Sequence, residues 1–426
     1  MLKNKKIPEL LVPANNLNIL KYAVNYGADA VYAGGKEFNL RSIRGNFTLP
    51  ELEEGVEYAH KNGVKIYFTL NSIVYEHELS RLRKYLKELK DINLDAIIVS
   101  DFGVLELIKE FLPGRKIHIS TQTNINNHLA VNFLGQLGTG RVNLAREINF
   151  SDLKTIIEKT NIEIEIFIHG ALCISYSGRC MLSKYMTGRD ANRGECTHSC
   201  RWKYYLMEEE RTNLFFPVEQ DKKGTYIYNS RDLCLLGKLK LLVDIGVDAF
   251  KIEGRMKTEN YVSLTTWVYR KALDYIKENK FTDNKISYLT GELDKCSHRN
   301  FTQGFMFLKD KSELENNENV GYVTKYRFIG IYHDFSKKYN GVVLSVKNQF
   351  RAGEVVDILQ PEKNPKKFMI GKIISMSNDT ETKCANPNEL VVLCGLGKVS
   401  PFSIFRIKEI KERDLKYNKS CKSLKS

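Results

Sequence analysis

The sequence predicts an α/β protein: a (β/α)8 TIM-like barrel with a long insertion after strand 7, followed by a small C-terminal all-β domain. Three observations lead to this fold class. Short β-branched runs alternate with amphipathic helical segments up to about residue 255. The alternation occurs eight times, which favours a closed barrel over a doubly wound sheet. No GxGxxG fingerprint of a dinucleotide-binding sheet follows the first run.

Each element of the barrel has its own signal. Segments such as 49–63 and 78–93 place apolar residues at three- and four-residue steps, as amphipathic helices do, and 258–279 is predicted to be the closing helix. Gly27, Gly63 and Gly246 can supply the left-handed residue that ends a helix. The eight predicted strands are residues 9–14, 28–34, 65–71, 96–101, 116–122, 141–147, 163–170 and 248–255.

The composition divides the chain into four parts. The barrel is predicted over residues 1–280, with a Cys-rich insertion at about 171–247 that is far longer than an ordinary βα loop. A polar linker is expected over 281–320. Period-two apolar runs over 321–410 predict a β-barrel or β-sandwich. The Lys-rich stretch 411–426 reads as a solvated basic tail, with a nucleic-acid-binding arm as the alternative.

Charge and hydropathy limit the class of partner. The formal net charge is +14, which favours a polyanion such as RNA, although a genome that prefers Lys codons gives the same balance. The N-terminal segment MLKNKKIPELLVPA lacks a signal-peptide apolar run, and no stretch reaches the 18 or so apolar residues of a membrane span. A cytoplasmic protein without a membrane partner is therefore expected.

Cysteines are concentrated in the insertion. Four of the nine lie between residues 173 and 200, a fifth follows, and arginines are interleaved among them. Thiolates are soft metal ligands, and neighbouring cations favour the thiolate form. The pattern indicates a Cys-ligated metal centre that faces an anionic substrate, with a structural four-thiolate zinc site as the alternative. The residues are Cys173, Cys180, Cys196, Cys200 and Cys234, with Arg179, Arg189, Arg193 and Arg201.

Polar side chains end most of the predicted strands. In a (β/α)8 barrel the active site lies at this C-terminal face. Glu253 and Arg255 suggest substrate contact or a mutual ion pair, and His169 is either a catalytic group or a rim histidine bonded to the backbone. The full set is Asn15, Gly34, Asn71, Asp101, Gln122, Glu147, His169, Glu253 and Arg255.

Substrate contacts are expected from both amides and arginines. Gln122 and Asn124, at the end of the fifth predicted strand, have the chemistry to read a base edge, although such amides are also turn residues. Asn71, at the end of the third predicted strand, is a further candidate for substrate contact. Arg189 and Arg193 suit phosphates or a dicarboxylate. Aromatic residues of the insertion either stack on an extruded base or pack the insertion against the barrel. These are Tyr176, Tyr185, Trp202, Tyr204 and Tyr205.

The segment EIFIHGALCISYSGRCMLS (165–183) resembles the signature of the collagenase-like peptidases of unknown catalytic type, family 32. GRDANRGEC (188–196), SRDLCLL (230–236) and DAFKIEGRMKTENYV (248–262) are similar to the same family in the same order. The resemblance covers at least residues 8–262. It implies a (β/α)8 protein with an oxygen-sensitive 4Fe-4S cluster that hydroxylates RNA bases or a ubiquinone precursor without molecular oxygen.

The tRNA branch of the family implies hydroxylation of the wobble uridine at carbon 5, with prephenate as hydroxyl donor and possible dependence on a paralogous subunit. The resemblance points to Cys173, Cys180, Cys196 and Cys234 as cluster ligands. Other relatives use both members of a Cys-x3-Cys pair, which keeps Cys200 as an alternative. His169, Glu253 and Arg255 are the expected catalytic residues.

Three alternatives compete with this interpretation. The substrate is an rRNA or a quinone precursor instead of tRNA, the protein is a peptidase, or it is a non-catalytic RNA-binding module. Neither HExxH nor GxSxG is present, so a zinc or serine peptidase lacks its motif. A Cys–His pair that includes His169 or His198 stays open.

Overall fold

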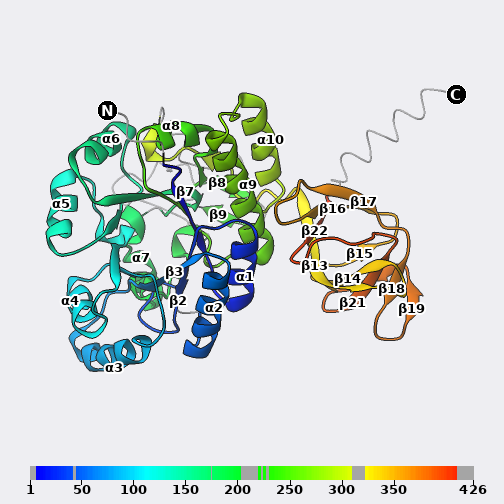
Figure 1. Ribbon diagram of the computed structural model, residues 1–426, viewed down its shortest axis with the longest axis horizontal. Coiled ribbons are helices and arrows are strands. Elements are labelled where there is room, and N and C mark those ends of the chain that lie inside the picture. Colours follow the sequence, from blue (N-terminus) through cyan, green and yellow to red (C-terminus); the bar gives the residue numbers. More distant parts are fainter. Residues whose placement is uncertain are drawn as a thin grey trace, which may run out of the picture. The chain divides into compact units, whose positions relative to one another are not determined.

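The structure, a computed structural model, describes residues 6–41, 45–173, 175–202, 219–221, 224–226, 230–308 and 322–409. These residues form two compact units (Figure 1). One unit is drawn from residues 1–290 and 298–322. The other is drawn from residues 291–297 and 323–426.

The first unit is a closed barrel of eight parallel strands. The last barrel strand, β11 (Ala249–Ile252), pairs in parallel with both β1 (Glu9–Pro13) and β7 (Glu163–Ala171), which closes the sheet. The intervening strands follow in chain order, so the predicted (β/α)8 fold is confirmed. They are β2 (Ala30–Gly34), β3 (Lys65–Leu70), β4 (Ala96–Val99), β5 (Lys116–Ile119) and β6 (Arg141–Asn143).

Helices alternate with the strands and surround them (Figure 1). Helix α2 begins with a capping box, in which Thr48 N donates to Glu51 Oε2 at 2.8 Å. Gly27, Gly63 and Gly246 have φ of 98°, 72° and 91°, which confirms their predicted left-handed role. No helix in the described part of the chain has the length and apolarity to cross a bilayer. The barrel helices are α1 (Leu17–Asn25), α2 (Leu49–Lys61), α3 (Leu79–Leu89), α4 (Phe102–Phe111), α5 (His128–Gln136), α6 (Phe150–Lys159), α8 (Leu239–Asp244) and α9 (Glu259–Lys277).

Paired charges fill the barrel where its strands begin. Arg141, 4% exposed, donates to Glu9 at 2.6 Å and to Glu163 at 2.7 Å, and it lies 3.4 Å from Glu165. Lys251 Nζ donates to the other Glu165 oxygen at 2.8 Å. Burial disfavours the cation, but Glu165 and Glu9 raise the pKa of Arg141 above its usual value. This end of the barrel is therefore closed by satisfied ion pairs.

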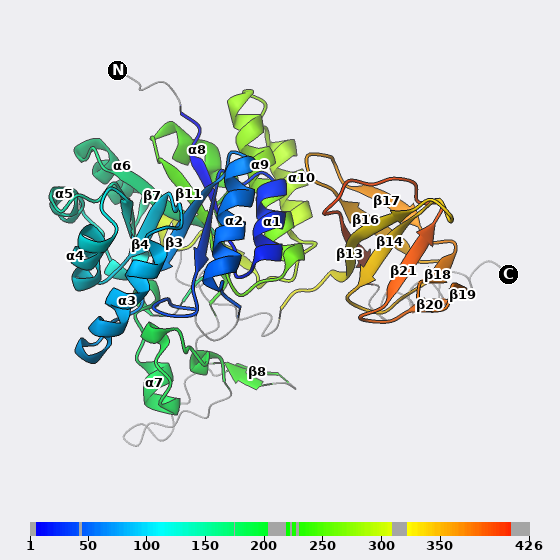
Figure 2. The same cartoon turned by 60° about the horizontal axis from the view of Figure 1, so that its bottom comes forward.

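The insertion between β7 and β11 adds structure beyond one end of the barrel, where helix α7 (Leu182–Thr187) lies (Figure 2). Its short strands are β8 (Glu219–Asp221), β9 (Gly224–Tyr226) and β10 (Asp232–Cys234). Strand β10 pairs antiparallel with the end of β7 and parallel with β12 (Phe301–Thr302). The insertion is therefore joined to the barrel by continuous sheet.

The segment predicted as a linker, 281–320, contains more structure than a linker. It includes helix α10 (Asp283–Leu293) and strand β12. A buried ion pair fixes this part of the chain, because Arg299 Nη2 donates to Asp232 Oδ1 at 2.6 Å. The pair connects two segments that are distant in sequence, which a reading of local polarity does not detect.

The second unit is an antiparallel β domain, as predicted. Its main sheet has the order β17-β16-β22-β13-β14-β21-β18-β19, and β15 pairs with β20. Fully buried Arg406 forms ion pairs with Asp357 and Glu292. The strands are β13 (Tyr326–Ser336), β14 (Gly341–Val346), β15 (Phe350–Arg351), β16 (Val355–Leu359), β17 (Lys366–Met369), β18 (Ile373–Ser375), β19 (Thr380–Thr382), β20 (Cys384–Ala385), β21 (Leu390–Cys394) and β22 (Ile404–Lys408).

Candidate active site

A cavity of about 690 Å³ lies between the C-terminal ends of the barrel strands and the insertion. Phe167 and Ala171 of β7, Gln122 after β5 and Glu253 after β11 line its barrel side. Residues 178–200 of the insertion line the other side. The cavity therefore lies at the face where (β/α)8 enzymes carry their active sites.

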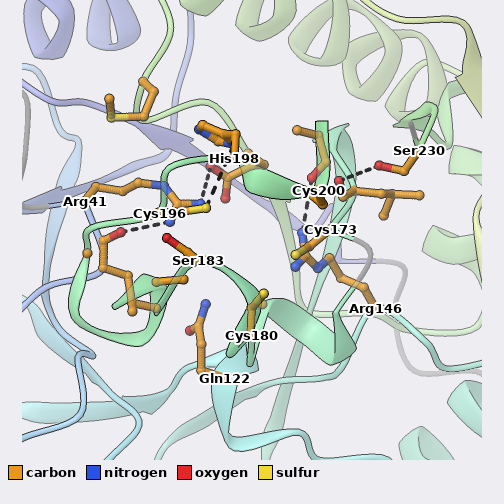
Figure 3. Close-up of a pocket in the computed structure, with 18 of the residues that line it drawn as sticks. Arg41, Gln122, Arg146, Cys173, Cys180, Ser183, Cys196, His198, Cys200 and Ser230 are labelled. Carbon is orange, nitrogen blue, oxygen red and sulfur yellow. Dashed lines mark hydrogen bonds and ion pairs between the residues drawn. The ribbon is translucent and has the colours of Figure 1, made fainter. Parts of the chain in front are cut away.

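Four thiols of the insertion line this cavity: Cys173, Cys180, Cys196 and Cys200. Figure 3 shows them around one space together with Arg41, Gln122 and Arg146. Each of the four is partly exposed, and none of them forms a disulfide. Cys196 Sγ lies 4.0 Å from Nδ1 of His198. The structure thus brings together a soft donor set and several cations.

Hydrogen bonds hold the thiol-bearing loops in place. Cys180 N donates to Asn192 Oδ1 at 3.2 Å, and Asn192 Nδ2 donates back to Cys180 O at 2.9 Å. Glu147, which was predicted at this face, accepts from Ser177 N at 2.6 Å. Gly170, with φ of 112°, leaves room for the close approach of Glu253, since an added Cβ would lie 2.5 Å from Glu253 O. These contacts connect the end of β7 and the described loops of the insertion to the barrel.

The donor chemistry fits a thiolate-ligated iron–sulfur cluster, because four thiols of one segment share one cavity. The sulfurs do not converge on one point: within the described ranges, no group of three or more His, Cys, Asp or Glu side chains is placed to hold a metal ion. The described thiols therefore have the chemistry of such a site without the convergence of a formed one.

Cys234 does not line this cavity. It is the last residue of β10, where it pairs with His169, and its Sγ lies 3.7 Å from the hydroxyl of Tyr269 on α9. Cys200 is instead the fourth thiol at the cavity. Among the dispersed cysteines, Cys296 is buried and Cys384 and Cys394 are partly exposed, while Cys421 lies outside the described residues.

His169 lies in the protein interior, away from the cavity. It is 2% exposed, its Nδ1 is 3.3 Å from the hydroxyl of Tyr269, and the rings of Tyr261 and Phe301 pack beside it. Burial lowers its pKa to about 3, so the ring is neutral near pH 7. The expected catalytic role is not supported by this placement.

A β-bulge explains the orientation of His169. In the β11–β7 pairing, Lys251 pairs with Phe167 but Ile252 pairs with His169, so β7 has one extra residue. Such a bulge turns the following side chains to the other face of the sheet. His169 therefore packs against α9 instead of pointing into the barrel.

Glu253 and Arg255 both face the barrel mouth, but they do not form the mutual ion pair that was the alternative to substrate contact. Glu253 lines the cavity with its carboxylate 3.8 Å from Arg41. Buried Arg255 donates to three neutral oxygens at 2.6–2.8 Å, and burial lowers its pKa to about 10. Arg255 is therefore a cation near pH 7. The three acceptors are Thr69 Oγ1, Asn39 Oδ1 and Asn46 Oδ1.

The two predicted anion-binding arginines differ in their surroundings. Arg189 lines the cavity and makes no ion pair with any described residue. Arg193 donates two hydrogen bonds to Glu78, at 2.6 and 2.7 Å, and lies over the ring of Tyr75. Hydrogen bonds from Arg193 lower the pKa of Glu78 to about 2. Arg193 thus clamps the insertion to the barrel, whereas Arg189 is available to an anion.

Two of the predicted amides, Asn71 and Gln122, line a smaller inner cavity of about 40 Å³. Asn71 Nδ2 donates to Ser120 Oγ at 3.1 Å and to Gln122 Oε1 at 3.4 Å. Gln122 also lines the outer cavity, so it connects the two.

The lining residues that were not predicted include Arg41, Asn143, Arg146 and Lys257. The predicted strand 141–147 placed Glu147 at the strand end, but β6 ends at Asn143. Arg41 does not end a predicted strand, and only the three-dimensional fold brings it to the cavity. Nothing in its local sequence distinguishes it. Arg146 lies next to Glu147, and Lys257 lies two residues after Arg255. Both could have been predicted if the residues flanking each strand end had been included as candidates.

Exposed aromatic side chains of the insertion lie near the thiols in the chain. Tyr176, Tyr185 and Trp202 are 47%, 89% and 41% exposed. Exposed rings of this kind are suited to stacking on bases. Tyr204 and Tyr205 lie outside the described residues.

Comparison with known proteins agrees with the motifs. The model of "Peptidase family U32" matches residues 15–316, and that of the "Peptidase family U32 C-terminal domain" matches residues 324–406. The chain is 40% identical over 358 residues to "tRNA hydroxylation protein P1" of Bacillus subtilis (strain 168), covering 84% of each chain. It is 35% identical over 432 residues to "tRNA hydroxylation protein P" of Haemophilus influenzae, covering 91% of this chain and 93% of that protein. A 23S rRNA 5-hydroxycytidine synthase of Escherichia coli (strain K12) is 38% identical over 304 residues, covering 70% of this chain and 45% of that protein. The chain belongs to peptidase family U32.

Proposed function

We propose that this protein hydroxylates carbon 5 of a pyrimidine in RNA, and that its substrate is the wobble uridine of a tRNA. The observation that carries the proposal is the cavity at the barrel mouth, where four thiols and unpaired cations meet. The names of the relatives support it, since two of those compared are tRNA hydroxylation proteins and a third is an rRNA 5-hydroxycytidine synthase.

The cofactor in this proposal is a 4Fe-4S cluster. Cys173, Cys180 and Cys196 would supply three ligands, and Cys234 or Cys200 the fourth. A bound cluster of this kind supplies one-electron redox chemistry.

RNA would bind through phosphate contacts and stacking. The formal net charge of +14 favours a polyanion, and Arg189 and Lys257 at the cavity have no carboxylate partner within the described residues. Tyr176 and Trp202 suit stacking on bases exposed from an anticodon loop. Because the reacting base must reach the strand ends, it would be turned out of its stack into the cavity.

Prephenate is the proposed hydroxyl donor. Its two carboxylates need cationic partners, and a guanidinium binds a carboxylate with two parallel hydrogen bonds. Arg189 and Arg41 line the same cavity and are suited to this role. Glu253 beside Arg41 would position that arginine.

The experiment uses full-length protein purified without air. We expect it to be brown, to contain about four irons per chain and to form 5-hydroxyuridine in unmodified tRNA when prephenate is added. Colourless protein with stoichiometric zinc would contradict the cofactor. Hydroxycytidine in rRNA with unchanged tRNA would move the substrate to rRNA, and cleavage of denatured collagen without any RNA product would favour a peptidase.

A further inference from the structure

The inner cavity continues the outer one into the barrel. The two share six lining residues: Leu40, Arg41, Thr121, Gln122, Phe167 and Glu253. A volume of about 40 Å³ accepts roughly three water-sized groups. This is enough for one edge of a planar ring whose body stays in the outer cavity.

Asn143 is the unexplained residue of this inner cavity. It is 2% exposed, and neither Oδ1 nor Nδ2 has a hydrogen-bond partner among the described residues. It is the last residue of β6 and pairs in register with Glu165, whose side chain points into the barrel toward Lys251. Buried polar groups in folded proteins are nearly always hydrogen-bonded. An amide with both groups unpaired, at a cavity, indicates a ligand.

Gln122 contributes a donor at the junction of the two cavities, both of which it lines. Its Oε1 accepts hydrogen bonds from Asn71 Nδ2 and Ser120 Oγ, which fixes the orientation of the amide. Its Nε2 makes no hydrogen bond to the described residues and lies on the side of Gly178, 3.9 Å from where a Cβ added to that glycine would be. Asn143 therefore offers a donor–acceptor pair inside the inner cavity, and Gln122 offers one fixed donor at its entrance.

We propose that the inner cavity binds the Watson–Crick edge of the target pyrimidine and that Asn143 reads this edge. This inference rests on the proposed function. Uracil presents an acceptor, a donor and an acceptor at O2, N3–H and O4. Asn143 Oδ1 accepts from N3–H while Nδ2 donates to one carbonyl, and Gln122 Nε2 donates to the other. The same Asn143 amide, rotated by half a turn, pairs with N3 and N4 of cytosine.

This orientation also places the reacting atom correctly. With C2, N3 and C4 directed into the inner cavity, C5 and C6 face outward, into the outer cavity. That cavity is lined by Cys173, Cys180 and Cys196. The edge of the base that Asn143 reads thus lies in the inner cavity, and the carbon that is hydroxylated lies in the outer cavity.

The test uses full-length, anaerobically purified protein and tRNA that carries either uridine or 3-methyluridine at the target position. Methylation removes the N3–H donor. For the wild type, we expect kcat/KM to fall about 10- to 100-fold with the methylated RNA, as for loss of a bidentate base contact. Asn143→Ala should show a similar loss with uridine and little further loss on methylation. Thr139→Val removes another buried, unpartnered polar group, just before β6, and should behave as the wild type.

The alternatives give different results. If the wild type hydroxylates neither RNA, the proposed function fails, and this inference with it. If the wild type is active and Asn143→Ala keeps both its kcat/KM and its sensitivity to methylation, only the inference fails. Asn143→Ala should melt close to the wild-type temperature, because it loses no protein hydrogen bond, and its kcat/KM is measured on the folded protein. Asn143→Asp has the same size but only acceptors, and it should lose activity as Ala does, so it carries the test if Ala does not fold.

Discussion

The two ends of the barrel differ in how their charges are satisfied. Where the strands begin, Arg141 and Lys251 are buried and bonded to carboxylates of Glu9, Glu163 and Glu165. Where the strands end, Arg189 has no ion pair with a described residue and Arg255 is bonded only to neutral oxygens. Both ends belong to the same strands, so the difference does not come from the fold.

The difference separates stability from function. A buried charge without a partner is unfavourable, and the end at which the strands begin avoids it by pairing each group. The end at which they finish keeps unpaired cations, thiols and an unbonded amide, all around connected cavities. We expect substitutions at the first end to change the free energy of unfolding and substitutions at the second to change the chemistry.

The largest effect is expected at the thiols. Cys180→Ala should lose most of its iron and all hydroxylation, while the free energy of unfolding of the barrel changes little, since the side chain is partly exposed. Iron analysis of anaerobic protein and urea unfolding measure the two quantities. Cys384→Ala, in the β domain, is the matched control and should keep its iron. Full iron in Cys180→Ala would show that the cluster is not bound at the end of the barrel where the strands finish.

The fourth ligand sharpens the same comparison. Similarity to relatives favours Cys234, whereas the geometry places Cys200 at the cavity and Cys234 against Tyr269. As the resemblance to the family implies, we expect Cys234→Ala to lose iron and Cys200→Ala to keep it. The reverse result would assign the ligand to the Cys-x3-Cys pair and leave Cys234 as a packing residue.

At the opposite end, Arg141→Met should destabilise the fold. It leaves Glu9 with only Lys65 and Glu165 with only Lys251 as cationic partners. Removing one partner from this buried network costs about 3–5 kcal/mol in the free energy of unfolding. The turnover of the folded fraction should be unchanged. Urea unfolding and kcat test this prediction, and a variant with normal stability but low kcat would contradict the division between the two ends.

A smaller effect is expected at the two arginines of the insertion. Arg189→Ala should raise KM for tRNA or for prephenate about 10-fold, as for the loss of one strong anion contact, without a change in stability beyond about 0.5 kcal/mol. Arg193→Ala should lower the free energy of unfolding and leave both KM values unchanged, because its guanidinium is bonded to Glu78. Unchanged KM values for both substrates in Arg189→Ala would exclude it from substrate binding.

The smallest effect concerns pH. Arg193 lowers the pKa of Glu78 from its usual value near 4.5 to about 2. The carboxylate therefore contributes stability above about pH 4.5, and this contribution is lost as the pH falls through about 2. We expect the melting temperature of the wild type to decrease over this range more than that of Arg193→Met. Parallel pH profiles for the two proteins would show that the clamp contributes nothing.

The sequence was sufficient for the fold because each element carries its own local signal. Eight apolar runs, helices at three- and four-residue steps and glycines such as Gly246 are all properties of short segments. The linker prediction failed at helix α10 and β12, where the deciding contact, Asp232 with Arg299, joins residues 67 positions apart.

The site could be predicted in part. Glu253, Gln122 and the thiols were found because strand ends and cysteine spacing are visible in the chain. The burial of His169 could not be predicted, because it follows from a β-bulge that depends on the neighbouring strand. Asn143 was missed because β6 ends four residues before the predicted boundary. Both differences concern where a strand ends and which face of the sheet a residue occupies.

Nucleoside mass spectrometry of RNA from a strain that lacks this gene tests the central claim most directly. The strain is complemented with either the wild-type chain or Cys180→Ala. We expect 5-hydroxyuridine-derived nucleosides to disappear from tRNA on deletion, to return with the wild type and to stay absent with Cys180→Ala, while rRNA is unchanged. An unaltered tRNA profile in the deletion strain, or full restoration by Cys180→Ala, would contradict it.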